Sequence, residues 1–410
     1  MRRLLSSLGN PEQNFESVVI AGTNGKGSVS AFLCGILNAH GRRVGLYTSP
    51  HVYSVNERIA IDGKRVPIEV LEEAASRIVP LYEAIGYSYF EALTAIAFLV
   101  FAESGIKLAV LETGLGGRFD ATNVVVPKVS VLTGISLDHR RILGDSEEEI
   151  LREKLGITRP GVPLFCGRLL PELETIVRSR SLRDGIPLHV VGETGSVELR
   201  HMSFHGMRAR IRTERGDYGE IPLPFLGEHQ LGNALLSVRV AESLLADVDR
   251  LESAAGLVRL PGRFEVVRLG NKTVVLDVAH NNEALTATAR TLRALSPREE
   301  NAMILGILRR KEFRDFPMEI PSTVNSVYLV EPVIGESHTA GQLLEKIGPK
   351  NWKNKTLNVY LERNLVNDDD WMTYAERLAS STSPFRALLV TGSHRTVEIL
   401  GRHFHRLESG

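Results

Sequence analysis

The sequence has little cysteine, no excess of either charge and no long apolar run. Cys34 and Cys166 are its only cysteines, too few for a disulfide framework, which favours a reducing compartment. Lys and Arg together number 49, as do Asp and Glu, so no net charge draws the chain to nucleic acid or to an anionic membrane. The most apolar segment, Ala92 to Ala102, is far shorter than the ~20 residues that cross a bilayer. These absences predict a cytoplasmic protein with neither nucleic-acid nor membrane partners.

The pattern of apolar residues predicts an α/β fold. At 410 residues the chain is long for a single hydrophobic core, so more than one domain is expected. Short continuous apolar runs, typical of buried strands, alternate with apolar repeats at helical spacing, and this predicts a doubly wound, mainly parallel sheet. The predicted strands cover residues 17–21, 44–48, 108–111 and 129–133, and predicted helices cover 29–37, 68–85 and 90–103. Between Val197 and Leu223, shorter alternating runs predict antiparallel hairpins added at the edge of this domain.

A second, smaller domain is predicted after the segment LPGRFEV, residues 260–266. The Pro-Gly pair in this segment is typical of a break between elements. Beyond it the alternation resumes, with predicted strands at 274–277, 303–307, 327–330 and 388–390. We therefore predict a first domain over residues 1–260 and a Rossmann-like α/β domain over 261–410.

The stretch AGTNGKGS, residues 21–28, has the glycines, lysine and hydroxyl of a phosphate-binding loop, at shorter spacing than the common G-x-x-x-x-G-K-[ST] form. It lies between a predicted strand and a predicted helix, so its backbone amides and the helix N-terminus can face an anion. Lys26 can offset the charge of terminal phosphates, and the Ser28 hydroxyl can bind Mg²⁺. Glu112, at the end of the neighbouring apolar run LAVL, is in the position expected of a second metal ligand.

His139 is a further candidate at this predicted sheet edge, and Lys154 follows it on a predicted helix. His139 follows Asp138 after a predicted buried strand, where open α/β sheets bind ligands, which favours a role at a metal or substrate. Lys154 lies in a predicted helix that begins near Ser146, and from the residues alone it is a solvated helix lysine.

Seven strings, in order along the chain, resemble the folylpolyglutamate synthase/dihydrofolate synthase family within the Mur ligase superfamily. They are AGTNGKGS, YTSPHVYSVNERI, ETGLGGRFDATN, LDHRRILGD, REKLGI, PGRFEV and LDVAHN. The second and third strings point to the folate branch rather than to the cell-wall ligases. The shortened loop resembles the phosphate loop of Mur-type ligases.

The resemblance implies an ATP-dependent ligase that attaches L-glutamate to a carboxylate of folate or dihydropteroate, acting as a monomer. It implies two Mg²⁺ ions, held by Ser28, Glu112 and His139, and it allows for a monovalent cation. Lys154 corresponds to the lysine that CO₂ carbamylates in this family. The catalytic residues implied are Lys26, His139, Lys154 and His280. The ATP contacts implied, from both domains, are Thr23, Asn24, Gly25, Lys26, Gly27, Ser28, Asn233, Arg263 and Asp277. The folate contacts implied are Ser49, Pro50, His51 and Arg58.

This chain departs from the family pattern on the substrate side. Leu155 replaces the alanine of the family's EKAGI, and Arg309–Glu312 replaces a DKD-like run. Thr391–Arg395 reads TGSHR where TGSLY is usual, and the chain begins near the family's counterpart of Leu4.

The chemistry implied by the resemblance is transfer of the ATP γ-phosphate to the carboxylate, followed by attack of the glutamate amine on the acyl phosphate. Two other readings stay open. One is a Mur-type ligase that acts on a different acidic acceptor. The other is a nucleotide-binding regulatory protein without catalysis, which would predict damage at Glu112, His139 or Lys154; all three are intact.

Overall fold

The computed structural model describes residues 1–297, 301–309, 311, 319–347, 358–362, 365–380, 383 and 385–409. These residues divide into two compact units. One comprises Met1–His201, Arg208–Pro224 and Gln230–Arg259, and the other comprises Met202–Met207, Phe225–His229 and Leu260–Gly410.

The first unit is built on a mainly parallel sheet with strand order β4-β3-β2-β5-β1-β6-β7-β8. Its strands are β1 (Glu16–Ala21), β2 (Val44–Tyr47), β3 (Ile59–Ile61), β4 (Lys64–Arg65), β5 (Leu108–Glu112), β6 (Val129–Leu132), β7 (Leu164–Cys166) and β8 (Leu188–Val190). Strands β2, β5, β6, β7 and β8 run parallel to β1. At one edge of the sheet, β3 is antiparallel to β2 and β4 is antiparallel to β3. The predicted doubly wound, mainly parallel sheet is confirmed.

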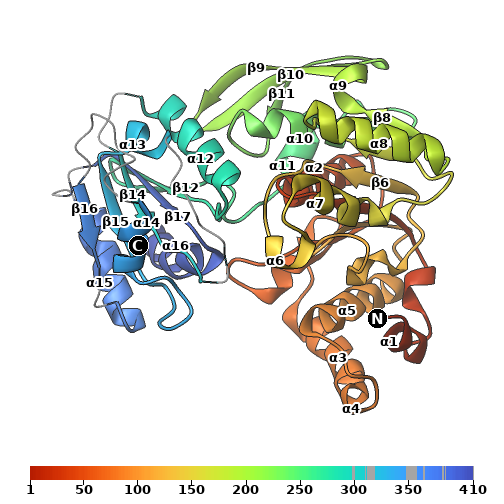
Figure 1. Cartoon of the computed structure of the whole chain (residues 1–410), viewed down its shortest axis with the longest axis horizontal. Coiled ribbons are helices and arrows are strands. Elements are labelled where there is room, and N and C mark those ends of the chain that lie inside the picture. The colour runs from red at the N-terminus through yellow and green to blue at the C-terminus, as the bar shows by residue number, and fades with distance from the viewer. Residues whose placement is uncertain are drawn as a thin grey trace. The chain divides into compact units, whose positions relative to one another are not determined.

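Helices cover both faces of this sheet. The helices up to residue 259 are α1 (Arg2–Ser7), α2 (Lys26–Ala39), α3 (Ile68–Ile78), α4 (Tyr82–Ile85), α5 (Tyr89–Glu103), α6 (Arg140–Leu143), α7 (Glu147–Lys154), α8 (Pro171–Arg183), α9 (Val191–Thr194), α10 (His229–Leu244) and α11 (Leu251–Gly256). Short 3₁₀ turns lie at Pro11–Gln13, Val55–Arg58, Val79–Leu81, Ala121–Val124 and Leu155–Ile157. Helices α3 and α5 lie side by side (Figure 1), and α5 packs Phe98 and Phe101 into the core over the sheet residues Val19 and Leu111. Helix α2 packs on β1, β2 and β5 and against α11.

Two local predictions differ from the structure. The helix predicted over 68–85 is broken, because Pro80 lies in a 3₁₀ turn that separates α3 from α4, and proline lacks the amide that an α-helix needs. The hairpins predicted over 197–223 form β9 (Gly195–Ser203), β10 (Gly206–Thr213) and β11 (Gly216–Leu223). These strands make a sheet of their own, in the order β11-β10-β9, and the antiparallel edge of the large sheet comes from β3 and β4 instead.

The second unit holds a mixed sheet with strand order β12-β13-β17-β14-β15-β16. The strands are β12 (Glu265–Leu269), β13 (Lys272–Leu276), β14 (Asn301–Leu305), β15 (Ser326–Leu329), β16 (Asn358–Leu361) and β17 (Ala387–Thr391). The helices are α12 (Asn282–Leu295), α13 (Glu319–Thr323), α14 (Ala340–Ile347), α15 (Asp368–Ala379) and α16 (His394–Ser409). Strand β12 is antiparallel to β13, and the other pairs are parallel, which is the expected Rossmann-like arrangement.

Candidate active site

The glycine loop connects β1 to α2, and two of its glycines are required by close contacts. Lys26, Gly27 and Ser28 form the first turn of α2, and Gly25 is its N-cap with φ of 86°. A Cβ at Gly25 would lie 2.5 Å from Asn233 Oδ1, so the predicted ATP contact Asn233 lies directly against the loop. A Cβ at Gly22 would lie 1.9 Å from Thr133 Oγ1. Only glycine fits at these two positions, since any side chain would push away the residues that line the loop.

The segment that follows β6 holds the loop in place. The Thr23 amide donates to Gly134 O at 2.8 Å, and the Thr23 hydroxyl donates to Ser136 O at 3.1 Å. The Thr133 hydroxyl donates to Asn24 O at 2.6 Å. Because strands β1 and β6 are neighbours in the sheet, these bonds fix the loop backbone without any ligand. The role of Thr133 was not predicted from the sequence, because its contact joins segments more than a hundred residues apart.

Two lysines converge on one carbonyl of the loop. Lys26 Nζ donates to Gly22 O at 3.1 Å and to Thr23 O at 3.2 Å, and Lys154 Nζ donates to Gly22 O at 2.7 Å. Lys154 is the last residue of α7, which begins after a Ser146 cap as predicted, and it is only 4% exposed. Burial, reinforced by the nearby charge of Lys26, lowers the pKa of Lys154 to about 7. Lys154 is therefore not a solvated helix lysine.

Glu112 and Ser28 provide oxygen ligands of the kind that Mg²⁺ prefers. Glu112 ends β5, is paired in register with Ile20 of β1, and is 2% exposed. Ser28 is also buried, in the first turn of the helix that follows β1. Over the described residues, no group of three or more His, Cys, Asp or Glu side chains could hold a metal by itself. One carboxylate and one hydroxyl suit a Mg²⁺ ion that takes its other ligands from phosphate and water, so these residues fit the implied ion.

His139 lies at the start of α6, after β6. Its φ of 51° is left-handed, and its amide donates to the Asp138 carboxylate at 2.8 Å. Its Nε2 lies 3.9 Å from Asp138 Oδ1, and its side chain is about 39% exposed. The structure therefore places His139 beside a carboxylate at the carboxyl edge of the sheet.

The four residues that the resemblance assigns to folate lie in the connection between β2 and β3. The Ser49 amide donates to Glu112 Oε2 at 3.0 Å, and Pro50 follows through a cis peptide bond. The Arg58 guanidinium donates from Nε to His51 Nδ1 at 2.9 Å, and Arg58 is largely buried. The connection therefore touches the predicted metal ligand at one end and holds a basic pair at the other.

Asp120 organises the loop that follows Glu112, and it is not among the residues predicted from the sequence. Its carboxylate accepts from the amides of Gly114 and Leu115, both at 2.9 Å, and from the amide of Thr122 at 3.0 Å. Burial raises the pKa of Asp120, and these bonds oppose the rise. Asp often accepts a hydrogen bond from the backbone amide two residues further along the chain, and this forms a turn in glycine-rich segments. The string GGRFDAT therefore contains a sequence signal for this turn.

The second unit contains the other predicted nucleotide contacts. Asp277 follows β13 and accepts from the amides of Phe264 and Ala279 at 2.9 and 2.8 Å. Burial raises the pKa of Asp277, and the charge of Arg263 opposes that rise. His280 Nδ1 lies 2.8 Å from Val278 O, and its ring is 5.7 Å from that of His394. Arg263, Asp277 and His280 thus lie around the carboxyl end of β13.

The altered family strings of the second unit are placed only in part. The Thr391 hydroxyl donates to Ala279 O at 3.1 Å, so the TGSHR segment lies beside the LDVAHN segment. Arg309 Nε donates to Ser337 O at 2.8 Å, while Arg310 and Glu312 lie outside the described residues. In the part of the chain that the structure describes, no helix is both long and apolar enough to cross a membrane.

Comparison with known protein families matches two domains. Residues 20–241 match the Mur ligase middle domain, and residues 262–394 match the Mur ligase glutamate ligase domain. A dihydrofolate synthase/folylpolyglutamate synthase of Bacillus subtilis is 32% identical over 367 residues, which cover 86% of this chain and 85% of that protein. The corresponding protein of Escherichia coli is 32% identical, with 80% of this chain and 76% of that protein covered.

Solved structures agree with this match. Folylpolyglutamate synthase of Mycobacterium tuberculosis, complexed with ADP and AMPPCP, superposes with a TM-score of 0.86 at 31% identity and covers 98% of this chain and 93% of that one. E. coli FolC in complex with DHPP and ADP gives a TM-score of 0.81 at 27% identity, with 98% and 92% covered.

Proposed function

The chain belongs to the folylpolyglutamate synthase/dihydrofolate synthase family of Mur-type ligases, and we propose that it uses ATP to join L-glutamate to a folate carboxylate. The observation that carries the proposal is the position of Glu112 at the end of β5. The Ser49 amide of the connection between β2 and β3 donates to the Glu112 carboxylate, and Glu112 is paired in register with Ile20 of β1, the strand that leads into the glycine loop. This arrangement supports a site in which phosphate and acceptor carboxylate meet.

The first step is binding of the ATP phosphates by the glycine loop. The loop is already held by Thr23 and Thr133, so its amides need little reordering to face an anion. Lys26 Nζ bonds to the loop carbonyls of Gly22 and Thr23, so it lies at the loop and can turn to the terminal phosphates.

The second step moves the γ-phosphate to the acceptor. A carboxylate is a poor electrophile, so the γ-phosphate is first transferred to it, which gives an acyl phosphate and ADP. Mg²⁺ held by Ser28 and Glu112 would neutralise charge on the phosphoryl oxygens. The Arg58–His51 pair supplies a positive group for the acceptor's carboxylate or its ring, at the other end of the same connection.

The third step is attack of the glutamate amine on the acyl carbon. The amine must be neutral to attack, and the new amide forms as inorganic phosphate leaves. We assign this part of the reaction to the second domain, residues 261–410, where Arg263, Asp277 and His280 lie at one strand end.

Lys154 is proposed to carry a carbamate. CO₂ adds only to a neutral amine, and burial lowers the pKa of Lys154 to about 7, so much of it is neutral near that pH. The product is an anion that can face a metal ion, which a lysine cannot. The carbamate nitrogen keeps one hydrogen, so it can still donate to Gly22 O.

The experiment that tests the proposal is release of phosphate from ATP with a panel of acceptors. Dihydropteroate and tetrahydrofolate are each offered with L-glutamate, and D-glutamate and L-aspartate serve as control amines. Phosphate release that needs both a pteroate and L-glutamate, with the glutamylated product seen by mass, is expected. Release with a different acidic acceptor, and with none of the pteroates, would replace the folate assignment while keeping the ligase.

A further inference from the structure

A buried carboxylate without an assigned role holds the connection between β2 and β3. We name this connection, residues 48–58, the acceptor loop. Its base is closed by a backbone bond from Thr48 N to Arg58 O at 2.9 Å, and strands β2 and β3 pair on either side of it, with Tyr47 opposite Ile59. The carboxylate belongs to Glu57, near the loop's C-terminal end.

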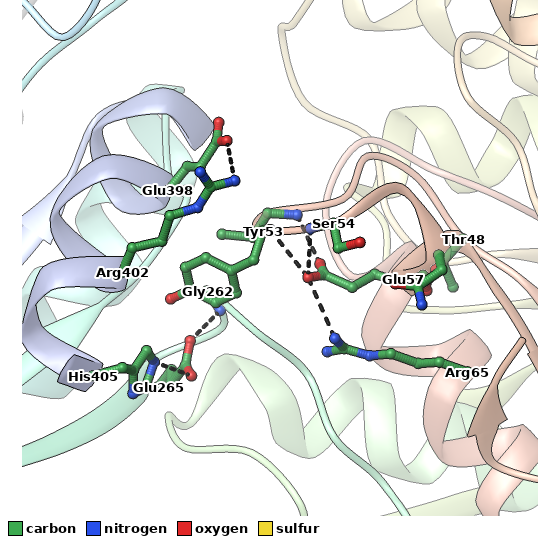
Figure 2. A network of polar contacts seen from close by, with 12 residues as sticks. Thr48, Tyr53, Ser54, Glu57, Arg65, Gly262, Glu265, Glu398, Arg402 and His405 are labelled. Carbon is green, nitrogen blue, oxygen red and sulfur yellow. Dashed lines mark hydrogen bonds and ion pairs between the residues drawn. The ribbon is translucent and has the colours of Figure 1, made fainter. Parts of the chain in front are cut away.

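Three consecutive amides of the acceptor loop point to this one carboxylate. Glu57 Oε2 accepts from Val52 N at 2.8 Å, and Oε1 accepts from Tyr53 N and Ser54 N, both at 3.0 Å. Figure 2 shows Tyr53 and Ser54 on one side of the carboxylate and Arg65 of β4 on the other, 3.6 Å from Oε1. The Glu57 side chain is about 8% exposed, so these are charge-assisted bonds shielded from water.

The Glu57 carboxylate accepts more backbone bonds than the cap of a helical turn needs. Glu57 is the third residue of the 3₁₀ turn Val55–Arg58, and its bond to Ser54 N completes a capping box. Val52 and Tyr53 precede that turn, so their bonds fix loop backbone that the turn itself does not involve. This backbone lies between His51 and Arg58, whose side chains bond to each other.

The loop held by Glu57 makes the two polar contacts on which the proposed acceptor site depends. At its start, the Ser49 amide donates to Glu112 Oε2, and at its end Arg58 donates to His51. Both contacts depend on the path of the backbone between residues 49 and 58. Without the bonds to Glu57, the loop backbone would have to be ordered each time these two contacts form, and that ordering has an entropic cost.

We propose that Glu57 is a positioning residue for the acceptor substrate. Its carboxylate gathers the amides of Val52, Tyr53 and Ser54, and thereby sets the Arg58–His51 pair and the Ser49–Glu112 bond without touching the substrate. The inference rests on the proposed function only in naming the acceptor as a folate.

The test compares Glu57→Gln and Glu57→Asp with a matched control, Asp370→Asn. Glutamine has nearly the shape of glutamate, but it loses the charge and turns an N–H₂ group towards amide donors. Aspartate keeps the charge but is one methylene shorter. Asp370 accepts from the amides of Val366 and Asn367 at the start of α15, in the other unit, so its substitution removes the same kind of bond from a segment without site residues.

We expect Glu57→Gln to lower kcat/KM for the pteroate acceptor by about tenfold or more, because small displacements of positioning groups have effects of that size. The Mg²⁺ concentration that gives half-maximal activity should rise, because Ser49 no longer orients Glu112. The KM for ATP at saturating Mg²⁺ should stay within about threefold of the wild-type value. Glu57→Asp should recover part of the loss, and Asp370→Asn should alter none of these constants. An acceptor kcat/KM within about twofold of wild type, or an equal change in all the constants, would overturn the inference.

The inference and the proposed function can fail separately. If the wild-type protein glutamylates no pteroate, the function is wrong, and hydrogen exchange together with Mg²⁺-dependent ADP binding decides the inference. Faster exchange at the amides of residues 52–54 and weaker dependence of ADP binding on Mg²⁺ are expected for Glu57→Gln. Faster exchange with unchanged Mg²⁺ dependence would overturn the inference. If Glu57→Gln does not fold, the same measurements on Glu57→Asp decide it.

Discussion

Replacing Lys154 by alanine tests whether this buried lysine serves the reaction as a carbamate. An ordinary lysine, with a pKa of 10.5, is only about 0.03% neutral at pH 7, whereas a pKa of about 7 makes about half of Lys154 neutral. The reactive fraction therefore rises by about three orders of magnitude, and that amine can capture CO₂ from solution. We expect Lys154→Ala to lose most ligase activity and to regain part of it in the presence of acetate, which can occupy the place of the missing anion.

The carbamate itself can be observed directly. Wild-type protein equilibrated with ¹³C-bicarbonate should give a carbamate carbonyl signal in the ¹³C spectrum, and Lys154→Ala should lack it. Activity at limiting bicarbonate should rise as the pH rises through about 7, because only the neutral amine reacts. A fully active Lys154→Ala protein, or a wild-type protein without the signal, would refute the reasoning.

Three other perturbations probe the two units. Glu112→Gln should reduce turnover by at least ~100-fold, because the proposed metal ligand is lost, and the loss is measured by titrating activity with Mg²⁺. Near-normal turnover at limiting Mg²⁺ would exclude Glu112 as a metal ligand. Gly25→Ala should weaken ADP binding, measured by calorimetry, about tenfold or more, because the added methyl group would meet Asn233. Gly9 has a similar φ of 81° and no atom within 4 Å of an added Cβ, so Gly9→Ala should leave ADP binding unchanged. His405→Gln should lower the free energy of unfolding more at pH 6 than at pH 9, by up to about 1 kcal/mol. The bond to Glu265 raises the pKa of His405, so the stabilisation is present below the ordinary histidine pKa and is lost as the pH rises through the raised value. An equal loss of unfolding free energy at both pH values would contradict this.

The last of these perturbations acts on the loop that follows Leu260. Figure 2 shows His405 of α16 beside Glu265, whose other oxygen accepts from Gly262 N at 2.8 Å. The loop that carries Arg263 is therefore tied to the C-terminal helix within the second unit. A stability change without a change in nucleotide binding would mean that this tie serves the fold alone.

The main elements and the phosphate loop could be predicted from local patterns. Continuous apolar runs give the buried strands, and a glycine loop between a strand and a helix has few other uses. Glu112 could be placed because the carboxyl ends of parallel strands share one edge of the sheet. The break at Pro80 was predictable in principle, since proline interrupts helical hydrogen bonding, but apolar spacing on both sides of it favoured one helix.

The roles of Lys154 and Glu57 could not be deduced from local patterns. Lys154 is distinguished by burial and by a bond to Gly22, 132 residues away, whereas its own helix is polar in sequence. Glu57 satisfies the backbone amides of Val52 and Tyr53 in an irregular loop, and the direction of such amides depends on tertiary packing. Strands β3 and β4 were missed because each is too short to show an alternating pattern.

The central claim is that the folate carboxylate is activated by phosphoryl transfer before the amine attacks. Labelling both oxygens of that carboxylate with ¹⁸O tests it most directly, because an acyl phosphate passes one carboxylate oxygen to the phosphate that leaves. With ATP, L-glutamate and the labelled acceptor, we predict inorganic phosphate that carries one ¹⁸O and a new amide that retains the other. Phosphate without label, formed together with the glutamylated product, would contradict the account.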